Sequence, residues 1–416
     1  MAPGRRTLAA GPDRDPDGSA LLTTDAVEPL LRAAVEHRGG VLRSWRIDHV
    51  DTNPAHSTTA TYAALVDWAY GRRQELIGVS VRAEGVSATD ARAEIYADGE
   101  REVAIWLYPF DPDLPGLARA AYPEQVAEMI SELGLVGRDV AAEDLTLTMI
   151  GYRPRRRAVL RVVLHHPHEV LYIKVLREQM VAGTLARYDL LMAAGVPAPI
   201  VAASTPDHLL VLRELPGRPL ARALFDPVDP CRAGDLVALL DSLPPSVVEL
   251  ERRPPWSDSV AHYASMVGQA VPALEGRLDW MLGRIQDGIG GLPLGHEATH
   301  GDFHEGQVHV RDGEVVGILD IDTVGPGRRA DDLACLVAHL STIQRMNTEQ
   351  QERVRHLLRS WVPVFDQRVE PDELRLRTAA VIISLATGPF RGQEPDWPRE
   401  TTRMIDAAEA VIRQVS

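Results

Sequence analysis

The chain has 416 residues, 45% of them hydrophobic and 25% charged, which is enough for two or three domains with their own cores. A formal net charge of −15 argues against nucleic acid or an anionic membrane as a partner and favours a neutral or cationic small molecule. The two cysteines form no disulfide framework, and no apolar run is long enough to span a bilayer. We therefore expect a cytoplasmic protein, either a monomer or a homodimer.

The N-terminal quarter predicts a small α/β subdomain. The first twenty residues lack the apolar core of a signal peptide, and we expect them to form an unstructured tail. A helix is predicted over Thr24–His37, with a threonine as its N-cap. Residues 41–110 then alternate polar and apolar side chains in several stretches, which is typical of a sheet. We place a cap subdomain at residues 1–110.

A second group of strands contains the only lysine of the chain. The predicted elements are a helix at Pro123–Leu133, strands at Leu145–Tyr152, Ala158–Leu164 and Glu169–Leu176, a helix at Arg177–Ala194 and a strand at Leu209–Leu215. All but one of the 44 Lys and Arg residues are arginine, and the exception is Lys174 in an apolar strand. A lysine kept against such a bias indicates a compact ammonium group that a guanidinium does not replace. A surface lysine retained by chance is the alternative.

Beyond residue 215 the sequence predicts helices around one short hairpin. The candidate helices are residues 231–242, 257–287, 330–345, 348–361, 371–386 and 399–414. We therefore divide the remaining chain into a β-rich domain at residues 111–215 and a helical domain at residues 216–416.

The stretch from His300 to Asp332 carries the clearest chemical signal. It reads His-Gly-Asp-Phe-His-Glu-Gly-Gln at residues 300–307, and a short apolar strand then ends at Asp320. An acid, an amide five residues later and a second acid at a strand end are the groups that phosphoryl transfer needs. One carboxylate accepts the proton of the attacking hydroxyl, while the amide oxygen and the other carboxylate hold Mg²⁺. The alternative is an acidic surface loop beside an ordinary hairpin.

This stretch resembles the active site of the aminoglycoside phosphotransferase and choline kinase superfamily, distant relatives of the protein kinases. The usual pattern there is His-Gly-Asp, an Asn five residues after the Asp, a strand ending in Asp, and Asp-Leu-Ala opening a helix. The chain has Gln307 instead of the Asn, which is similar to the maltokinases and related glucosamine kinases of actinobacteria. The resemblance implies ATP and Mg²⁺ as cofactors, Asp302 as catalytic base, Gln307 and Asp320 as metal ligands, and Asp332 as a structural acid.

The resemblance also implies an α+β, two-lobed protein-kinase-like fold, with a β-rich N-lobe, a mostly helical C-lobe and an extra N-terminal α/β cap subdomain. Lys174 would contact the ATP phosphates. Arg153 would do so from the turn at residues 152–157, which has no glycine where a protein kinase has several. A solvated hairpin tip is the alternative for this turn. Glu214 and Leu215 would bind adenine through backbone groups.

One C-terminal loop, residues 388–400, predicts a sugar-binding platform. Two prolines flank Trp397, whose indole face suits the C–H side of a pyranose, and Glu400 offers a carboxylate for hydroxyl or ammonium groups. The alternative is a tryptophan that fills a helix junction, beside a glutamate favoured by the helix dipole. Glu305 is a second candidate for the cationic amine of a substrate, and Asp302 would contact the acceptor hydroxyl.

These features together predict an ATP-dependent kinase acting on a sugar hydroxyl, and the resemblance favours the 6-hydroxyl of D-glucosamine as acceptor. Maltose, giving maltose 1-phosphate, and an aminoglycoside antibiotic are alternative acceptors. A nucleotide-binding pseudokinase module is the alternative from another class, and the joint presence of Lys174, Asp302 and Asp320 argues against it.

Overall fold

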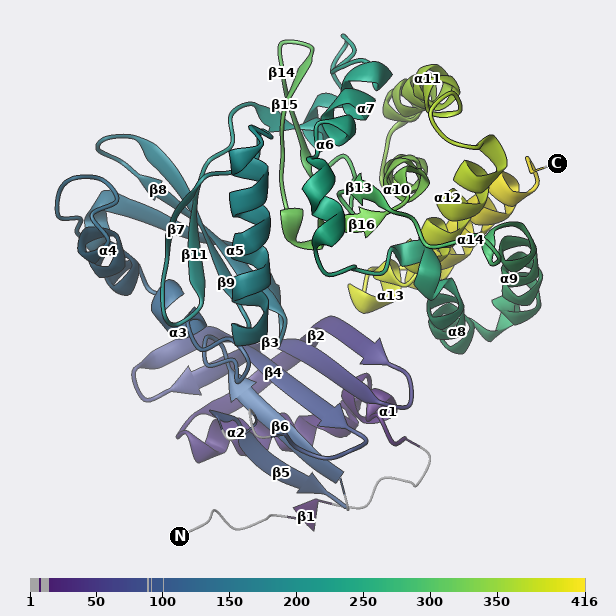
Figure 1. The fold of residues 1–416 in the computed structure, drawn as a ribbon. Helices are drawn as coiled ribbons and strands as arrows, with labels where there is room; N and C mark the ends of the chain where they lie inside the picture. Colours follow the sequence, from purple (N-terminus) through teal and green to yellow (C-terminus); the bar gives the residue numbers. More distant parts are fainter. Residues whose placement is uncertain (1–6, 9–14, 88–89, 91, 100, 416) are drawn as a thin grey trace. The chain divides into compact units, whose positions relative to one another are not determined.

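The protein divides into two compact units in a computed structural model that describes residues 7–8, 15–87, 90, 92–99 and 101–415. Unit 1 comprises residues 1–181, 201–213 and 391–393, and unit 2 comprises residues 182–200, 214–390 and 394–416. Unit 1 holds two sheets and unit 2 is mostly helical (Figure 1). The predicted α+β fold, β-rich first and helical later, is confirmed. Among the described helices, none has the length and apolar character needed to cross a membrane.

The first sheet of unit 1, the cap sheet, has the strand order β1-β5-β6-β4-β3-β2. Its strands are β1 (Thr7–Leu8), β2 (Val41–Asn53), β3 (Ser57–Trp68), β4 (Gly71–Arg82), β5 (Glu94–Asp98) and β6 (Arg101–Leu107). The helical segments before β2 are α1 (Ser19–Leu22), η1 (Asp25–Val27) and α2 (Glu28–His37). The apolar stripe of α2, including Leu31 and Val35, is buried in one core with Tyr62 and Val79 of the sheet. The cap therefore has its own hydrophobic core.

The segment just before α1 belongs to the cap, so the prediction of an unstructured tail over the first twenty residues is wrong there. The buried carboxylate of Asp15 accepts the N–H groups of Ala20 and Leu21, both at 3.0 Å. It also pairs with Arg101 at 2.8 Å. Local composition gave no sign of this order because the arginine lies 86 residues away in the sequence. The parts of the predicted tail at residues 1–6 and 9–14 lie outside the described residues.

The second sheet of unit 1, the lobe sheet, has the order β10-β11-β9-β8-β7. Its strands are β7 (Leu145–Arg153), β8 (Arg157–Leu164), β9 (Glu169–Leu176), β10 (Val201–Ser204) and β11 (Leu209–Arg213). The helical segments along this part of the chain are α3 (Leu117–Ala120), α4 (Pro123–Glu132), η3 (Ala142–Asp144) and α5 (Glu178–Ala193). Lys174 lies on the middle strand, β9, between Val159 of β8 and Leu210 of β11. Its side chain is only 4% exposed, so Lys174 is not a surface residue, and its functional role stays a prediction.

The turn between β7 and β8 fastens the lobe sheet to the cap. The guanidinium of Arg155 pairs with Asp90, and with Asp113 at 3.1 Å. Its backbone N–H donates to the carboxylate of Asp111 at 2.8 Å, and its side chain lies over the ring of Trp106. Arg155 is therefore buried, and the alternative of a solvated hairpin tip is wrong at this position. Arg155 therefore links the two sheets of unit 1.

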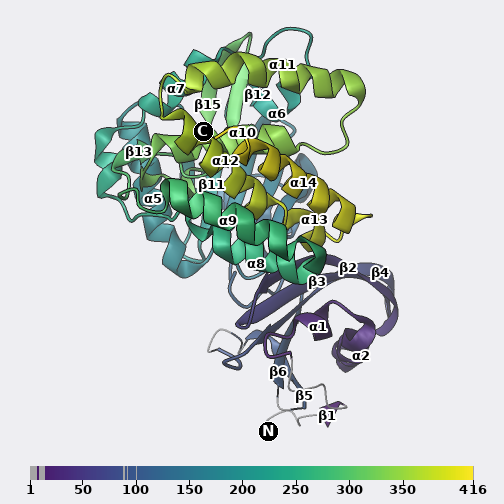
Figure 2. The same cartoon turned by 90° about the vertical axis from the view of Figure 1, so that its right-hand side faces the viewer.

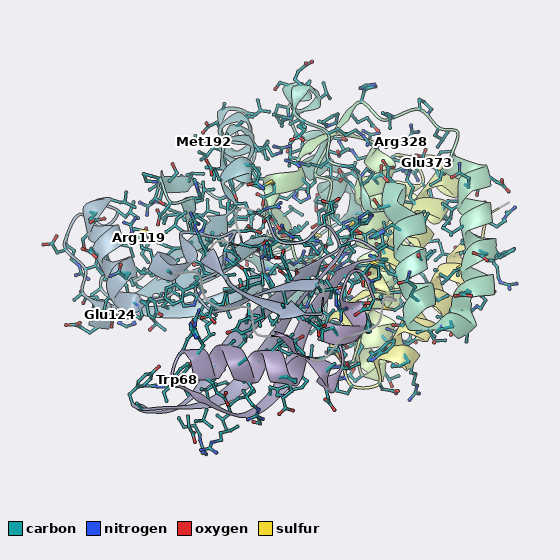
Figure 3. The ribbon with its side chains drawn as sticks, turned by 90° about the horizontal axis from the view of Figure 1, so that it is seen from below. Trp68, Arg119, Glu124, Met192, Arg328 and Glu373 are labelled. Carbon is teal, nitrogen blue, oxygen red and sulfur yellow. The ribbon has the colours of Figure 1, made fainter. Side chains whose placement is uncertain are left out.

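Unit 2 is built around a layer of packed helices. The longer helices are α7 (Ala233–Asp241), α8 (Val260–Ala270), α9 (Glu275–Ile289), α10 (Arg329–Thr342), α11 (Thr348–Phe365), α12 (Pro371–Leu385) and α14 (Trp397–Ile412). The short helical segments are α6 (Leu220–Ala223), η4 (Pro245–Glu249), η5 (Trp256–Ser259), η6 (Pro272–Leu274), η7 (Ile321–Thr323) and α13 (Gly388–Arg391). Helices α8, α9, α12 and α14 lie alongside one another and share one core (Figure 2). Arg328 pairs with Glu373 at 2.5 Å and fastens α12 to the start of α10 (Figure 3).

The single helix predicted at residues 257–287 is wrong, because the structure breaks it into η5, α8, η6 and α9. The break falls at Val271, which has φ −134° and ψ 79° directly before Pro272. A residue before proline is disfavoured in the helical region because the proline ring clashes with its backbone. The other predicted helices of unit 2 agree with the structure to within a few residues.

Candidate active site

Two small sheets of unit 2 place the His-Gly-Asp stretch. One consists of β12 (Arg218–Pro219), β14 (Val308–Arg311) and β15 (Glu314–Ile318), and the other pairs β13 (Glu297–Thr299) with β16 (Gly325–Gly327). The loop at residues 300–307 joins β13 to β14. It turns at Gly301, where φ is 83° and an added Cβ would lie 2.8 Å from the carbonyl oxygen of Thr323. Only glycine fits this backbone at this distance.

Backbone pairing places the two predicted metal ligands at adjoining strand ends. The N–H of Leu319 donates to the carbonyl oxygen of Gln307 at 2.7 Å, one step beyond the paired residues Val308 and Ile318. Asp320 follows in the left-handed conformation, with φ 50° and ψ 57°, and ends the extended run. The Gln307 amide and the Asp320 carboxylate both offer oxygen donors, which Mg²⁺ prefers. The donor set therefore fits a magnesium ion.

His300 ties the predicted base to the same strand end. Its Nδ1 accepts the backbone N–H of Asp302 at 3.3 Å, and its Nε2 lies 2.9 Å from the carbonyl oxygen of Leu319. The tautomer with the proton on Nε2 satisfies both contacts. The ring is fully buried, so it holds the loop and the hairpin in one geometry.

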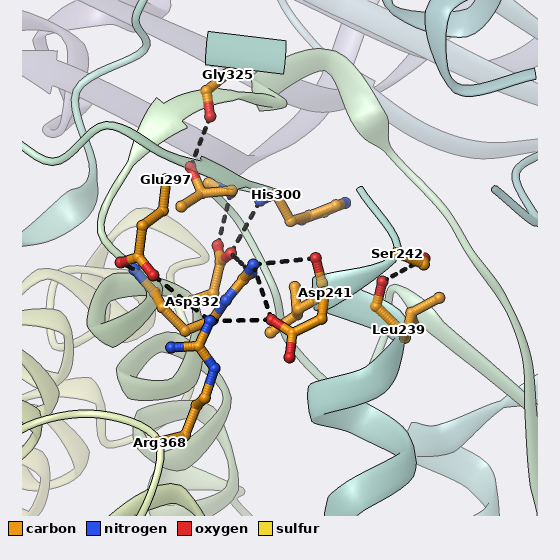
Figure 4. A network of polar contacts seen from close by, with 12 residues as sticks. Leu239, Asp241, Ser242, Glu297, His300, Gly325, Asp332 and Arg368 are labelled. Atoms are coloured by element: carbon orange, nitrogen blue, oxygen red, sulfur yellow. Dashed lines mark hydrogen bonds and ion pairs between the residues drawn. The ribbon is translucent and has the colours of Figure 1, made fainter. Parts of the chain in front are cut away.

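Asp332, in the first turn of α10, holds the loop from its other side (Figure 4). Its carboxylate accepts the backbone N–H groups of His300 at 2.9 Å and Gly301 at 2.8 Å. Burial raises the pKa of Asp332, although Arg329 at 3.3 Å and the two N–H donors act in the opposite direction. These contacts are those of an acid that supports the loop, as the sequence predicted.

The carboxylate of Asp302 is held by residues from two other elements. The indole N–H of Trp256 donates to Oδ1 of Asp302 at 3.0 Å, and the Cys335 thiol lies 3.9 Å from the same oxygen. Burial raises the pKa of the Cys335 thiol well above its ordinary value, so the sulfur stays protonated and acts as a weak donor. Both contacts involve Oδ1, and they fix the direction of the carboxylate.

Two histidines and a glutamate form a cluster beside Asp302. The rings of His304 and His339 are stacked, with centroids 4.2 Å apart and planes 7° from parallel. Oε2 of Glu305 lies 3.7 Å from Nδ1 of each ring and has no hydrogen-bond partner among the described residues. Burial alone would raise the pKa of Glu305, but the two imidazoles hold it below its ordinary value. A buried carboxylate oxygen without a donor suits a cationic ligand group.

The predicted ATP-binding residues are divided between the two units. Lys174 and Arg153 belong to unit 1, and Glu214 and Leu215 belong to unit 2. Arg153 is exposed at the end of β7, and Glu214 is also exposed. Leu215 is buried against the backbone of Gly317, where an added Cβ would lie 2.5 Å from the leucine side chain. These four roles in nucleotide binding stay predictions.

The predicted sugar platform has partners within its own segment. Trp397 begins α14 and meets the ring of Phe390 edge-on, with centroids 5.0 Å apart. Glu400 pairs with Arg403 at 2.9 Å, one helical turn further on. Both contacts agree with the alternative of a tryptophan that fills a helix junction. The contacts with acceptor predicted for Trp397 and Glu400 stay predictions.

Two residues of this site, Trp256 and His339, were not predicted from the sequence. A helical pattern could have found His339, because Asp332, Cys335 and His339 follow one another at intervals of three and four residues and share one face of α10. Trp256 gave no such signal, because 46 residues separate it from Asp302.

A known protein family matches the part of the chain that contains this loop. Residues 149–367, more than half of the chain, match the model of a family described as the phosphotransferase enzyme family. No protein with a curated description is similar enough in sequence to count as a relative. Among solved structures, choline kinase from Cryptosporidium parvum Iowa II is similar, with 10% identity, coverage of 70% of this chain and 95% of that chain, and a TM-score of 0.48.

Two further solved structures are similar at comparable levels. A thermostable mutant of aminoglycoside phosphotransferase APH(4)-Ia, in a ternary complex with AMP-PNP and hygromycin B, has 13% identity, coverage of 69% of this chain and 97% of that chain, and a TM-score of 0.49. Macrolide 2′-phosphotransferase MphH from Brachybacterium faecium has 19% identity, coverage of 70% and 97%, and a TM-score of 0.42.

Proposed function

Because the chain belongs to the phosphotransferase enzyme family, we propose that it transfers the γ-phosphate of Mg-ATP to a sugar hydroxyl, with the 6-hydroxyl of D-glucosamine as the preferred acceptor. Membership of the family confirms the predicted phosphotransferase and its superfamily. The subgroup of maltokinase-like glucosamine kinases, the nucleotide and the acceptor belong to the proposal.

Asp302 is the proton acceptor in this proposal. The two contacts that orient its carboxylate both use Oδ1, so we assign Oδ2 to the acceptor hydroxyl. As the hydroxyl oxygen attacks the γ-phosphorus and the bond to ADP breaks, its proton passes to Oδ2. The hydrogen bond from Trp256 and the backbone contact to His300 hold the carboxylate at one angle, which lowers the entropic cost of reaching this geometry.

We assign the binding of ATP and Mg²⁺ to six further residues. Gln307 and Asp320 would hold Mg²⁺ through an amide oxygen and a carboxylate. When bound, the ion would supply positive charge that offsets the negative charge of the phosphates. Lys174 and Arg153 would contact the phosphates, and the backbone around Glu214 and Leu215 would receive the adenine. The buried ammonium of Lys174, on the middle strand of the lobe sheet, supports this assignment.

The observation that carries the acceptor assignment is the buried carboxylate of Glu305. Its side chain is 15% exposed, and its Oε2 has no hydrogen-bond partner among the described residues. Oε2 of Glu305 lies 3.7 Å from Nδ1 of His304 and of His339, and each histidine has a ligand atom within 4.8 Å of one from Asp302. An ammonium group bound at Glu305 would therefore lie near the assigned base. Glu400 is the weaker candidate because the guanidinium of Arg403 pairs with it at 2.9 Å, whereas the imidazoles beside Glu305 lie 3.7 Å away.

A screen of acceptors tests the proposal, with ADP release measured for glucosamine, N-acetylglucosamine, glucose, maltose and kanamycin. We expect kcat/KM for glucosamine to exceed that for glucose by about a hundredfold or more, because an analogue without the amine leaves the carboxylate unpaired. Glu305→Gln should reduce the ratio of kcat/KM for glucosamine to that for glucose, and the matched change Glu400→Gln should not. A preference for maltose or kanamycin would show that glucosamine is not the acceptor. If only Glu400→Gln reduced the ratio, the amine would be bound by Glu400 in the C-terminal loop and not by Glu305.

A further inference from the structure

We propose that Asp302, His304 and His339 form a second metal site, which binds a divalent transition ion of the Zn²⁺ type and thereby blocks phosphoryl transfer. One ligand atom from each residue lies within 4.8 Å of the other two. Within the described ranges of the chain, no other three His, Cys, Asp or Glu residues meet this condition. The site uses other ligands than the magnesium site assigned to Gln307 and Asp320, and it adjoins that site where the Gln307 amide lies 3.0 Å from Nε2 of His304.

The donor set selects the class of ion. Two imidazole nitrogens and one carboxylate oxygen suit Zn²⁺, Co²⁺ or Ni²⁺, whereas Mg²⁺ prefers oxygen ligands and keeps its water. Zinc sites commonly combine three protein ligands of these types with one further position. The His and Asp side chains come from two elements, the catalytic loop and α10, so an ion would join them.

At least one histidine ring must rotate before a nitrogen lone pair of each ring can bind the same ion. Zinc–nitrogen bonds of about 2.1 Å place the ligand atoms of a tetrahedral site about 3.4 Å apart. The ring planes of His304 and His339 are nearly parallel at a centroid distance of 4.2 Å, so at least one ring has to turn about its Cβ–Cγ bond. His339 is the one placed to do so, because the ring of His304 is held by the N–H of Gly306, which donates to Nδ1 at 3.1 Å. The ion would then replace the Gln307 amide, which lies 3.0 Å from Nε2 of His304.

The charge around the cluster favours a dication. Oε2 of Glu305 lies 3.7 Å from Nδ1 of both histidines and has no hydrogen-bond partner among the described residues. Together with Asp302 it supplies two carboxylates, whose formal charge of about −2 balances the charge of one divalent cation. Glu305 is therefore positioned either to bind the ion as a fourth ligand or to neutralise it from the next shell.

Inhibition follows from the use of Asp302, and this part of the inference rests on the proposed function. A carboxylate bound to Zn²⁺ is a weaker base, so the ion would withdraw Asp302 from its assigned role as proton acceptor. The amide of Gln307 also loses a neighbour, because it lies 3.0 Å from Nε2 of His304. Added Mg²⁺ should not relieve the inhibition, since it competes poorly for imidazole nitrogen.

Binding is tested without substrates, on the full chain prepared without a polyhistidine tag and stripped of metal with a chelator. We expect Zn²⁺ calorimetry to give one ion per chain in the presence of excess Mg²⁺, and Co²⁺ to give the absorption of a low-symmetry site. His339→Asn should weaken Zn²⁺ binding by about a hundredfold. The matched control is His356→Asn, an exposed imidazole 3.8 Å from a single carboxylate, Asp229, and it should leave the affinity unchanged.

Absence of saturable Zn²⁺ binding, displacement by Mg²⁺, or equal losses in the two variants would overturn the site. Chemical modification of histidine in the unaltered protein gives a check that does not depend on a variant folding. Zn²⁺ should protect His304 and His339 from diethyl pyrocarbonate and leave His356 reactive, and unprotected rings would overturn the site. Zn²⁺ binding without loss of phosphoryl transfer would overturn the inhibition alone. The binding experiments need no acceptor, so they stand even if the proposed substrate fails.

Discussion

The indole N–H of Trp256 donates a hydrogen bond to Oδ1 of Asp302 across 3.0 Å. Trp256 begins η5 directly after a proline, and its ring also packs against Tyr263 with centroids 5.6 Å apart. These contacts leave the indole little freedom, so its N–H fixes the direction of the Asp302 carboxylate. The tryptophan is a positioning residue for the group that we assign as the base.

Trp256→Phe should therefore lower kcat by about tenfold to a hundredfold, because a misplaced base loses productive geometry. The KM for ATP should change little, since the indole N–H contacts the carboxylate rather than the nucleotide. Steady-state kinetics measure both constants. Trp280→Phe is the matched control, because Trp280 lies on α9 with 43% of its side chain exposed. Equal effects of the two changes would contradict a positioning role.

Asp302→Asn should lower kcat by about 10²–10⁴-fold, the range ascribed to a positioned general base. The asparagine oxygen can still accept the N–H of Trp256, so the fold of the loop should be kept. Calorimetry should accordingly show nearly unchanged ATP binding. Turnover of the variant close to that of the unaltered enzyme would remove Asp302 from the mechanism.

Local patterns were enough to predict the hairpin between Gln307 and Asp320 and the strand that carries Lys174. In both cases the apolar runs, the turn residues and the polar groups lie within about ten residues of one another, the range over which strand and turn signals act. The predicted strands Ala158–Leu164 and Glu169–Leu176 agree with β8 and β9 to within one residue. The predicted α+β, kinase-like fold followed from these local signals together with the resemblance of the loop.

Contacts between distant segments were not predictable in this way. Trp256 meets Asp302 across 46 residues, and Asp15 meets Arg101 across 86. No spacing in a single sequence records such pairs, because they arise only when separate elements pack. The break before Pro272 is a different case, since a proline in the sequence disfavours the helical conformation of the residue before it.

Lys174→Arg should lower kcat/KM for ATP by tenfold or more, equivalent to about 1.4 kcal/mol of transition-state stabilisation. The side chain is 4% exposed between two strands, and a planar guanidinium is wider than an ammonium group. The reverse exchange on the neighbouring strand, Arg161→Lys, serves as the control. Normal ATP kinetics in Lys174→Arg would show that the retained lysine has no special role.

Asp15→Asn should lower the free energy of unfolding of the cap by about 2 kcal/mol at neutral pH, because the carboxylate accepts charge-assisted hydrogen bonds. Burial alone would raise the pKa of Asp15, but the N–H groups of Ala20 and Leu21 and the charge of Arg101 hold it below its ordinary value. A lowered pKa in the folded state gives stability that is present above the unfolded value of about 4 and is lost as the pH falls through the folded value.

The difference in free energy of unfolding between the unaltered protein and Asp15→Asn should therefore become smaller below about pH 4. Urea unfolding at several pH values measures this difference. Asp25→Asn, at an exposed position of η1, provides the control and should show a much smaller difference at neutral pH. If the difference in free energy of unfolding between Asp15→Asn and the unaltered protein stayed constant down to pH 2, the ion pair of Asp15 would contribute nothing to stability.

Gln307→Asn is the sharpest test of the magnesium site, because it restores the residue usual in the superfamily and should nevertheless impair binding. The backbone of Gln307 is fixed by the N–H of Leu319 at 2.7 Å, so a side chain one methylene shorter withdraws its oxygen from the ion. The shorter amide also loses its contact with Nε2 of His304 at 3.0 Å. We expect the Mg²⁺ concentration for half-maximal rate to rise by about tenfold in Gln307→Asn.

Asp320→Asn should raise this Mg²⁺ concentration further, because it removes a charge as well as a ligand. Gln269→Asn, at an exposed position on α8, should leave the Mg²⁺ dependence unchanged. If Gln307→Asn and Asp320→Asn behave like this control, other residues hold the ion, and Gln307 and Asp320 at the ends of β14 and β15 are not metal ligands.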